Sequence, residues 1–283
     1  MHPALRTHIC DLFGVRYPIV QTGMGWVASF AQAPTRDTVR RLRDAGVVTV
    51  PTIGARRHAE KVAEWGVDAL IAQGAEGGGQ TASVPTSLLL PQVIDAVDLP
   101  VIAAGGFIDG RRLVAALAWG AAGIAMGTRF LLTRDSTVPE AIKEIYLGTA
   151  VTGTEVTAAI DGYSQRVIRT EVIERLEKAS GLTRLPRPLR NALVFRRQTG
   201  TSLRALVAEA LAMRRNQELT WSQVAMAASA PMLIKASMVD GAPEVGIVPT
   251  GQGVGLIDDV PTVAELIARI VEEADRTLRR LAG

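Results

Sequence analysis

The chain has 283 residues, 48% of them hydrophobic, and a formal net charge of +3 at pH 7, so it is long enough to bury a sizeable core in one α/β domain with appendages. It contains no run of 18 apolar residues, so no membrane span is predicted. A single cysteine, Cys10, excludes an internal disulfide and fits a reducing compartment. We therefore expect a cytoplasmic protein without a membrane partner.

The first predicted strand lies near the N-terminus. Residues 17–21 form a short apolar run that leads into Gly23, Met24 and Gly25. Flexible backbone at the end of a strand lets a flat cofactor ring lie close to the chain. A second strand-like run follows at 28–32, with no room for a helix between the two.

From residue 36 onward, helical and strand-like segments alternate. Apolar positions at helical spacing predict helices of about ten residues, and short apolar runs predict the strands between them. This alternation indicates a parallel sheet with right-handed crossovers. The predicted helices cover 36–45, 55–65, 88–97 and 111–119, and the predicted strands cover 47–51, 69–73, 100–104 and 122–126.

A dense cluster of glycine and polar residues follows the strand at 69–73. Ligand sites of α/β barrels lie at the carboxyl ends of the strands, and glutamine side chains offer donors and acceptors to a ring system. We therefore expect a ligand contact here, with a flexible loop as the alternative. We expect Glu76 to be a hydrogen-bonded loop carboxylate rather than a catalytic group. The candidate residues of the cluster are Gln73, Gly77, Gly78, Gly79 and Gln80.

The last two predicted strands each end in glycine, and one helix connects them. Gly105 and Gly106 follow the first of these strands, and Gly127 and Thr128 follow the second. Backbone N–H groups at such strand ends can approach an anion closely, and a threonine hydroxyl adds a donor. Two such turns in succession favour a phosphate site. The alternative is two ordinary turns in which glycine only supplies an unusual φ angle.

Beyond residue 132 the pattern becomes mostly helical. Thr262, with Glu265 three residues later, starts the last helix with a capping-box pattern. We divide the chain into an α/β barrel formed by 1–135 and 240–283 and a helical substrate-side insertion, 136–239. The other helices are predicted at 139–147, 165–178, 202–213 and 222–236.

The segment 163–215 is strongly basic. It contains 12 Arg and Lys residues against 4 Asp and Glu residues, which suits a polyanionic ligand such as a nucleotide or CoA. It lacks the interleaved aromatic residues of many RNA-binding segments, so no nucleic-acid partner is expected. A solvated helical face is the alternative.

Residues that usually carry acid–base, nucleophilic or metal chemistry are not clustered. None of the three histidines, at positions 2, 8 and 58, falls in a loop after a predicted strand. Cys10 has no partner that marks it as a nucleophile, and no group has metal-ligand spacing. The glycine-rich turn around Gln252 is weak evidence alone. Trp221 is a candidate for lining an apolar pocket, with a core position as the alternative.

Several segments, in this order along the chain, resemble a known family: PIVQTGMGW, DALIAQGAEGGG, PVIAAGGFIDG, GIAMGTRFL, and LTWSQVAMAASAPMLIKA with GQGVG. Over most of its length the chain is similar to the FMN-dependent nitronate monooxygenases, which are (β/α)8 barrels. Within that family it resembles an actinobacterial branch linked to steroid breakdown, whose substrate is a CoA thioester.

The resemblance implies that FMN lies across the strand ends and supplies the redox chemistry. It places the flavin ring against Gly23, Met24 and Gly25, the ring edge against Gln73, Gly77, Gly78 and Gly79, the phosphate against Gly105, Gly106, Gly127 and Thr128, and the substrate pocket beside Gln252 and Trp221.

Two features depart from the family pattern. The family's glycine cluster normally ends in a histidine that acts as base toward neutral nitroalkanes, whereas this chain has Gln80, whose amide has no useful basicity. Near residues 27–29 the chain also lacks about sixty to seventy residues, roughly two βα units. About six of the eight strands of a closed barrel then remain. An open sheet exposes its edges and loses one wall of the flavin site unless another chain fills the gap.

Three hypotheses follow. The first is an FMN-dependent oxidoreductase that oxidises nitronates or a related activated small molecule. The second is a flavin-dependent reductase or dehydrogenase of a steroid-derived acyl-CoA, and the third is a non-catalytic barrel remnant. A homo-oligomer is left open.

Overall fold

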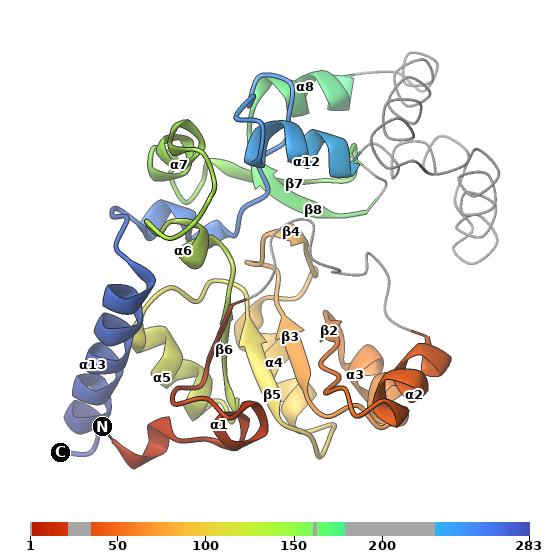
Figure 1. Cartoon of the computed structure of the whole chain (residues 1–283), viewed down its shortest axis with the longest axis vertical. Coiled ribbons are helices and arrows are strands. Elements are labelled where there is room, and N and C mark those ends of the chain that lie inside the picture. Colours follow the sequence, from red (N-terminus) through yellow and green to blue (C-terminus); the bar gives the residue numbers. More distant parts are fainter. Residues whose placement is uncertain (1, 22–34, 161–162, 179–229) are drawn as a thin grey trace.

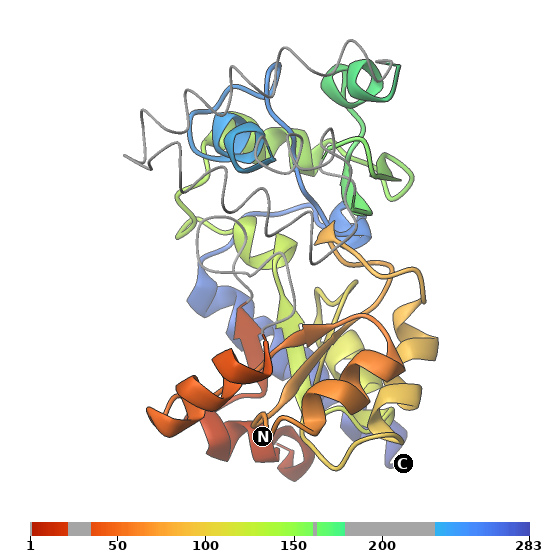
Figure 2. The same ribbon diagram turned by 90° about the vertical axis from the view of Figure 1, so that its right-hand side faces the viewer.

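The computed structural model describes residues 2–21, 35–160, 163–178 and 230–283 (Figure 1). These residues form a lower α/β part, which holds the main sheet and both chain ends, and an upper part with a small second sheet. Both views place the upper part beyond one end of the main sheet (Figures 1 and 2). The loop after strand β3 pairs with the small sheet, so the upper part lies at the carboxyl ends of the main strands.

Five parallel strands form the main sheet. Among the described residues their spatial order is β1-β6-β5-β3-β2, which matches the order of the first strand and the last four strands of a (β/α)8 barrel. Among the described residues, β1 and β2 form the two edges of this arc. The strands are β1 (Ile19–Gln21), β2 (Thr52–Ile53), β3 (Leu70–Gln73), β5 (Val101–Ala104) and β6 (Gly123–Met126).

The central strands are buried on both faces, as parallel strands covered by helices usually are. Every residue of β5 and β6 is buried. On one face, Val101, Ala103 and Ile124 pack in the large core beneath the helices, and on the other, Ile102 and Ala125 pack toward the short helix α1 (His8–Phe13). This double burial explains why both strands appear in the sequence as continuous apolar runs.

Helices cover one face of the arc and follow the predicted alternation closely. The capping box predicted for the last helix is present, because Thr262 Oγ1 accepts from Glu265 N and the Glu265 carboxylate accepts from Thr262 N. Helix α13 packs along α5 through a buried stripe that includes Leu266, Ile270 and Ala274. The helices are α2 (Arg36–Asp44), α3 (Arg56–Ala63), α4 (Thr86–Ile94), α5 (Gly110–Ala118) and α13 (Val263–Leu281).

The strand predicted at 47–51 is wrong in its position. The observed strand β2 comes later, and Val47 and Val48 are each 47% exposed. The Asp68 carboxylate accepts hydrogen bonds from both Thr49 N and Thr49 Oγ1, so a side chain occupies a donor that a regular ladder would use. Pro51 has no N–H to contribute.

The small sheet was not predicted. It is antiparallel in the order β4-β8-β7, formed by β4 (Gly79–Gln80), β8 (Gln165–Ile168) and β7 (Thr154–Thr157). The helix predicted over 165–178 is therefore wrong for its first six residues, of which Gln165–Ile168 form β8, and the helix α8 covers Glu171–Lys178. Val167 and Ile168 are β-branched and buried against neighbouring segments, and this tertiary pairing outweighs the helical spacing of the run.

The remaining upper helices are α6 (Thr128–Leu131), α7 (Glu140–Leu147) and α12 (Ala230–Met238). Helix α7 confirms the prediction at 139–147, and its Tyr146 hydroxyl donates to Pro249 O in the buried core of this part. Helix α12 confirms the end of the helix predicted over 222–236. The helix predicted over 202–213 and the strand predicted over 28–32 lie outside the described residues.

Candidate functional site

Three predicted glycine motifs meet at the carboxyl ends of the main strands. The backbone N–H of Gly251 donates to Thr128 Oγ1 at 2.9 Å, and the backbone N–H of Gln252 donates to Glu76 O at 2.9 Å. A Cβ atom on Gly78 would lie 2.5 Å from Gly251 N, so the glycine is required for this close approach. The loop after β3, the turn after β6 and the late glycine turn, which begins the 3-10 helix η2 (Gln252–Leu256), therefore form one cluster.

The turns after β5 and β6 lie side by side because their strands are neighbours in register, with Ala104 opposite Ala125. Gly105 and Gly106 have φ angles of 101° and 80°, a region that favours glycine. The backbone N–H groups of Gly106, Gly127 and Thr128 have no acceptor within the described part of the chain. Adjacent free donors of this kind suit a phosphate group.

The hydroxyl of Thr128 can act as a donor. Its oxygen already accepts the hydrogen bond from Gly251 N, and a hydroxyl that accepts one bond still has its proton to donate. Thr128 is 9% exposed, so its position is fixed by packing. Among the described residues, this side chain and the three N–H groups without an acceptor have the donor set that a phosphate requires.

Glu76 is a hydrogen-bonded loop carboxylate, as expected. Its Oε2 accepts from Thr86 N at 2.9 Å and from Thr86 Oγ1 at 2.7 Å, at the start of α4, where a negative charge is favourable. Gly105 packs against this corner, because a Cβ atom there would lie 3.0 Å from Thr86 Oγ1 and 3.1 Å from Gly77 N. The amino end of α4 is thus occupied by the protein's own carboxylate.

Gln73 and Gln80 are linked directly. Gln73 Nε2 donates to Gln80 O at 2.6 Å, so the amide nitrogen of Gln73 braces the loop, and its Oε1 is the atom available to a ligand. Gln80 lies on β4 with an exposed side chain. The loop that carries Gly77, Gly78 and Gly79 therefore presents Gln80 at the rim of the cluster.

Arg166 is a residue of this region that sequence reasoning missed. It comes from β8, and its guanidinium donates to Ala75 O through Nε at 3.2 Å and through Nη2 at 3.1 Å, and to Thr154 Oγ1 at 2.9 Å. It lies in the run that was predicted to be helical. The β-branched residues that follow it, Val167 and Ile168, are the strand signal that the sequence offers in this run.

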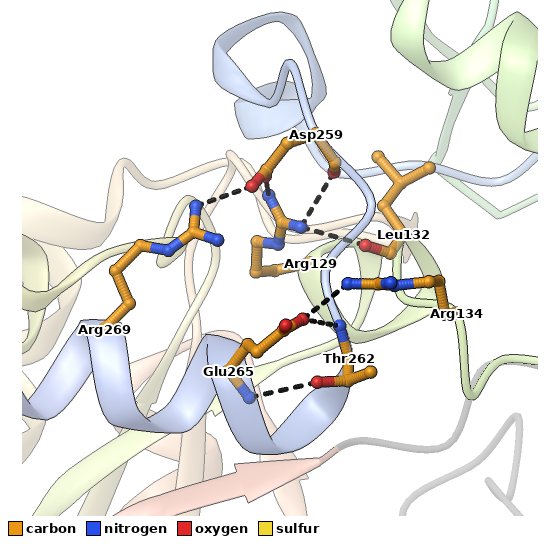
Figure 3. A network of polar contacts seen from close by, with 7 residues as sticks. All are labelled: Arg129, Leu132, Arg134, Asp259, Thr262, Glu265 and Arg269. Carbon is orange, nitrogen blue, oxygen red and sulfur yellow. Dashed lines mark hydrogen bonds and ion pairs between the residues drawn. The ribbon is translucent and has the colours of Figure 1, made fainter.

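Arg129 anchors the chain directly after the turn that follows β6 (Figure 3). Its side chain is 5% exposed, pairs with Asp259 Oδ1 at 3.0 Å, and donates through Nη2 to the backbone oxygens of Leu132 and Asp259, each at 2.9 Å. Arg269 on α13 pairs with the other Asp259 oxygen at 2.6 Å. These contacts hold the turn after β6 against the segment that leads to α13, and they leave the buried Nε of Arg129 without a partner among the described residues.

Four of the predicted site residues, Gly23, Met24, Gly25 and Trp221, lie outside the described residues. Within the described ranges, no group of three or more His, Cys, Asp or Glu residues is placed to hold a metal ion. No helix in the same ranges is both long and apolar enough to cross a membrane.

Comparison with known proteins gives a consistent family. A family profile described as nitronate monooxygenase matches residues 27–273. A (3aS,4S,5R,7aS)-5-hydroxy-7a-methyl-1-oxo-octahydro-1H-indene-4-carboxyl-CoA dehydrogenase of Mycobacterium tuberculosis is 44% identical, over 95% of this chain and 96% of the relative. The protein of the same name from Rhodococcus jostii is 41% identical, over 99% of this chain and 98% of the relative.

The alignment with the M. tuberculosis relative also supports the predicted internal gap. It spans 341 positions, whereas this chain has 283 residues. At least 58 aligned positions therefore have no residue here. The order of the main strands, with edges at β1 and β2, is consistent with a loss between these two strands.

Solved structures agree with the fold. FabK from Thermotoga maritima, a TIM barrel, superimposes with a TM-score of 0.67 at 29% identity, over 97% of this chain and 73% of that one. The fold is thus of the TIM-barrel type, as predicted. The profile match, the two relatives of nearly full coverage and this structural likeness together show that the chain belongs to the nitronate monooxygenase family of flavin-dependent oxidoreductases.

Proposed function

We propose that the chain binds FMN through the turns after β5 and β6. The observation that carries this proposal is that, in the part of the chain that the structure describes, the backbone N–H groups of Gly106, Gly127 and Thr128 have no acceptor. They lie beside a threonine hydroxyl that can donate its proton. These donors match the oxygens of a phosphate monoester, and the two positive-φ glycines keep side chains out of the space.

The flavin ring would then lie across the strand ends. Bound FMN would accept electrons from the substrate, and the protein would position the two. Gly23, Met24 and Gly25 would contact the ring, and Gln73 with Gly77, Gly78 and Gly79 would contact its edge. Gln252 and Trp221 would face the substrate.

The substrate class favoured by the relatives is a small acyl-CoA thioester derived from a steroid. Both relatives of nearly full coverage carry names of that activity. Oxidation of a nitronate is the second candidate, which the family match supports. Gln80 favours a nitronate over a neutral nitroalkane, because its amide cannot remove a proton from carbon. Removal of a carbon-bound proton from an acyl-CoA would need a base other than Gln80.

The organisation of the chain follows from this assignment. Residues 1–135 and 240–283 would form the flavin-binding barrel, and 136–239 the substrate side. We place the protein in the cytoplasm, since its lone Cys10 fits a reducing compartment. A homo-oligomer would provide one way to cover the open edges of the arc.

The absorbance spectrum of the purified protein tests the proposal. We expect the visible bands of a bound flavin, about one FMN released per chain, and flavin reduction by an acyl-CoA or nitronate substrate under anaerobic conditions. A colourless protein that also fails to bind added FMN would contradict the proposal and favour the barrel remnant.

A further inference from the structure

Arg166 is a partly buried cation at the edge of the proposed site. Its strand β8 pairs with β4, with Arg166 opposite Gly79 and Gln165 opposite Gln80. Its side chain extends to the loop after β3, where Nε and Nη2 both donate to Ala75 O. The guanidinium therefore lies between the small sheet and the glycine loop that carries Gln80.

The guanidinium has unused hydrogen-bonding capacity. Arginine has five N–H donors, and three of them are used, two on Ala75 O and one on Thr154 Oγ1. Two N–H groups thus remain without an acceptor in the part of the chain that the structure describes. Two such donors of one planar group match two oxygens of an anion.

The positive charge also lacks an ion-pair partner within 4.0 Å among the described residues. The acid that acts on it electrostatically is Glu76, whose carboxylate is engaged with Thr86 at the start of α4. Burial lowers the pKa of Arg166, and the charge of Glu76 opposes this effect. Arg169 on the segment after the same strand differs, because it pairs with Glu155 at 2.9 Å.

We infer that Arg166 binds the substrate as a delocalised oxyanion, the form of a nitronate that reaches the site already deprotonated. This inference rests on the proposed function. It identifies the charge state in which the substrate is held. A cation beside such an oxygen stabilises the ionised form over the neutral carbon acid. This role complements Gln80, which can donate a hydrogen bond but cannot act as a base.

Isothermal titration calorimetry with nitrate, a planar oxyanion, tests the inference on the FMN-loaded protein. We expect Arg166→Gln to weaken nitrate binding by about tenfold or more, as for the loss of hydrogen bonds to a charged group. Arg166→Lys keeps the positive charge but loses the planar pair of N–H donors, and we expect a smaller loss of nitrate affinity. The matched control is Arg169→Gln, which removes a paired arginine of the same region and should leave nitrate binding unchanged.

Folding and function are measured separately. The melting temperature and FMN content of each variant show whether the loop is intact, and Arg166→Lys carries the test if Arg166→Gln does not fold. Nitrate affinity that is equal in wild type and the Arg166 variants, or that falls equally in Arg169→Gln, overturns the inference. A protein that holds FMN and oxidises substrate but shows this result keeps the proposed function and loses only the role of Arg166.

Discussion

Arg129 and Asp259, 130 residues apart in the sequence, meet through an ion pair of 3.0 Å and a second hydrogen bond from Arg129 to the Asp259 backbone. The pair ties the turn after β6 to the segment that returns from the upper part to α13. Through Arg269, which also binds Asp259, it fixes that helix as well (Figure 3). These contacts therefore fix the position of the chain directly after the proposed phosphate turn.

Asp259→Ala should destabilise the protein strongly. It leaves the Arg129 guanidinium, which is 5% exposed, without its carboxylate. Because the Asp259 side chain is 34% exposed, we expect a loss of about 2 kcal/mol, as for hydrogen bonds to a charged group. Urea unfolding followed by circular dichroism measures the loss. The control is Arg134→Ala in the same network, whose pair with Glu265 is exposed on both sides and should contribute less than about 1 kcal/mol. Equal losses in the two variants would contradict a special role of the buried pair.

The same pair predicts a pH dependence. Burial raises the pKa of Asp259, but the hydrogen bonds and charges of Arg269 and Arg129 outweigh burial and leave this pKa below its ordinary value. A carboxyl group with a lowered folded pKa stabilises the fold above its unfolded value, about 3.9, and loses this contribution as the pH falls through the folded pKa. The difference in unfolding free energy between wild type and Asp259→Asn should thus shrink below about pH 4. A difference that stays constant from pH 6 downward would show that the charge of Asp259 is unimportant.

The sequence predicts the buried arc far better than the edges of the structure. Strand β6 occurs at Gly123–Met126, where its apolar run is bounded by glycine and both faces are buried. At 47–51 the apolar run has the same appearance, but the contact from Asp68 to Thr49 shifts the ladder. That contact joins residues 19 positions apart, which a local pattern does not show.

The candidate site also contains some features that the sequence predicts and others that it does not. The glycine turns at Gly105 and Gly127 follow from strand ends and are visible in the sequence. Arg166 reaches Ala75 across 91 residues, and its role depends on a strand pairing that helical spacing concealed. Such long-range polar contacts require the folded structure.

Gly105→Ala should impair FMN binding. At a φ of 101° the new side chain is strained by about 1–2 kcal/mol, and its Cβ atom would press on Thr86 Oγ1 and Gly77 N in the wall of the phosphate turn. Titration of FMN fluorescence should show an affinity at least about tenfold weaker. Gly14→Ala is the matched control, since Gly14 has a φ of 63° and open space around it. It should lower the melting temperature without changing FMN affinity, and the same loss of affinity there would refute the local explanation.

Thr128→Val removes the hydroxyl while keeping the shape of the side chain. Gly251 N then loses its acceptor and the phosphate loses a donor, so FMN should bind about tenfold more weakly. Thr133→Val is the control. Thr133 lies five residues after Thr128 in the same buried stretch, and its hydroxyl donates to Phe130 O. That change should affect unfolding and leave the FMN dissociation constant unaltered. Unchanged FMN affinity in Thr128→Val would remove this hydroxyl from the phosphate site.

Gln80→His should confer activity toward neutral nitroalkanes. The side chain at this position is exposed at the rim of the glycine loop, so a histidine there should titrate near its ordinary pKa of about 6.5 and act as a base above it. We expect anaerobic flavin reduction by nitroethane to be slow in wild type and to rise in the variant as the pH passes about 6.5. Gln80→Asn keeps an amide and should resemble wild type. A histidine variant that binds FMN fully but reduces no faster than wild type would show that the limit lies elsewhere, in a substrate pocket that does not bring the nitroalkane carbon within reach of this position.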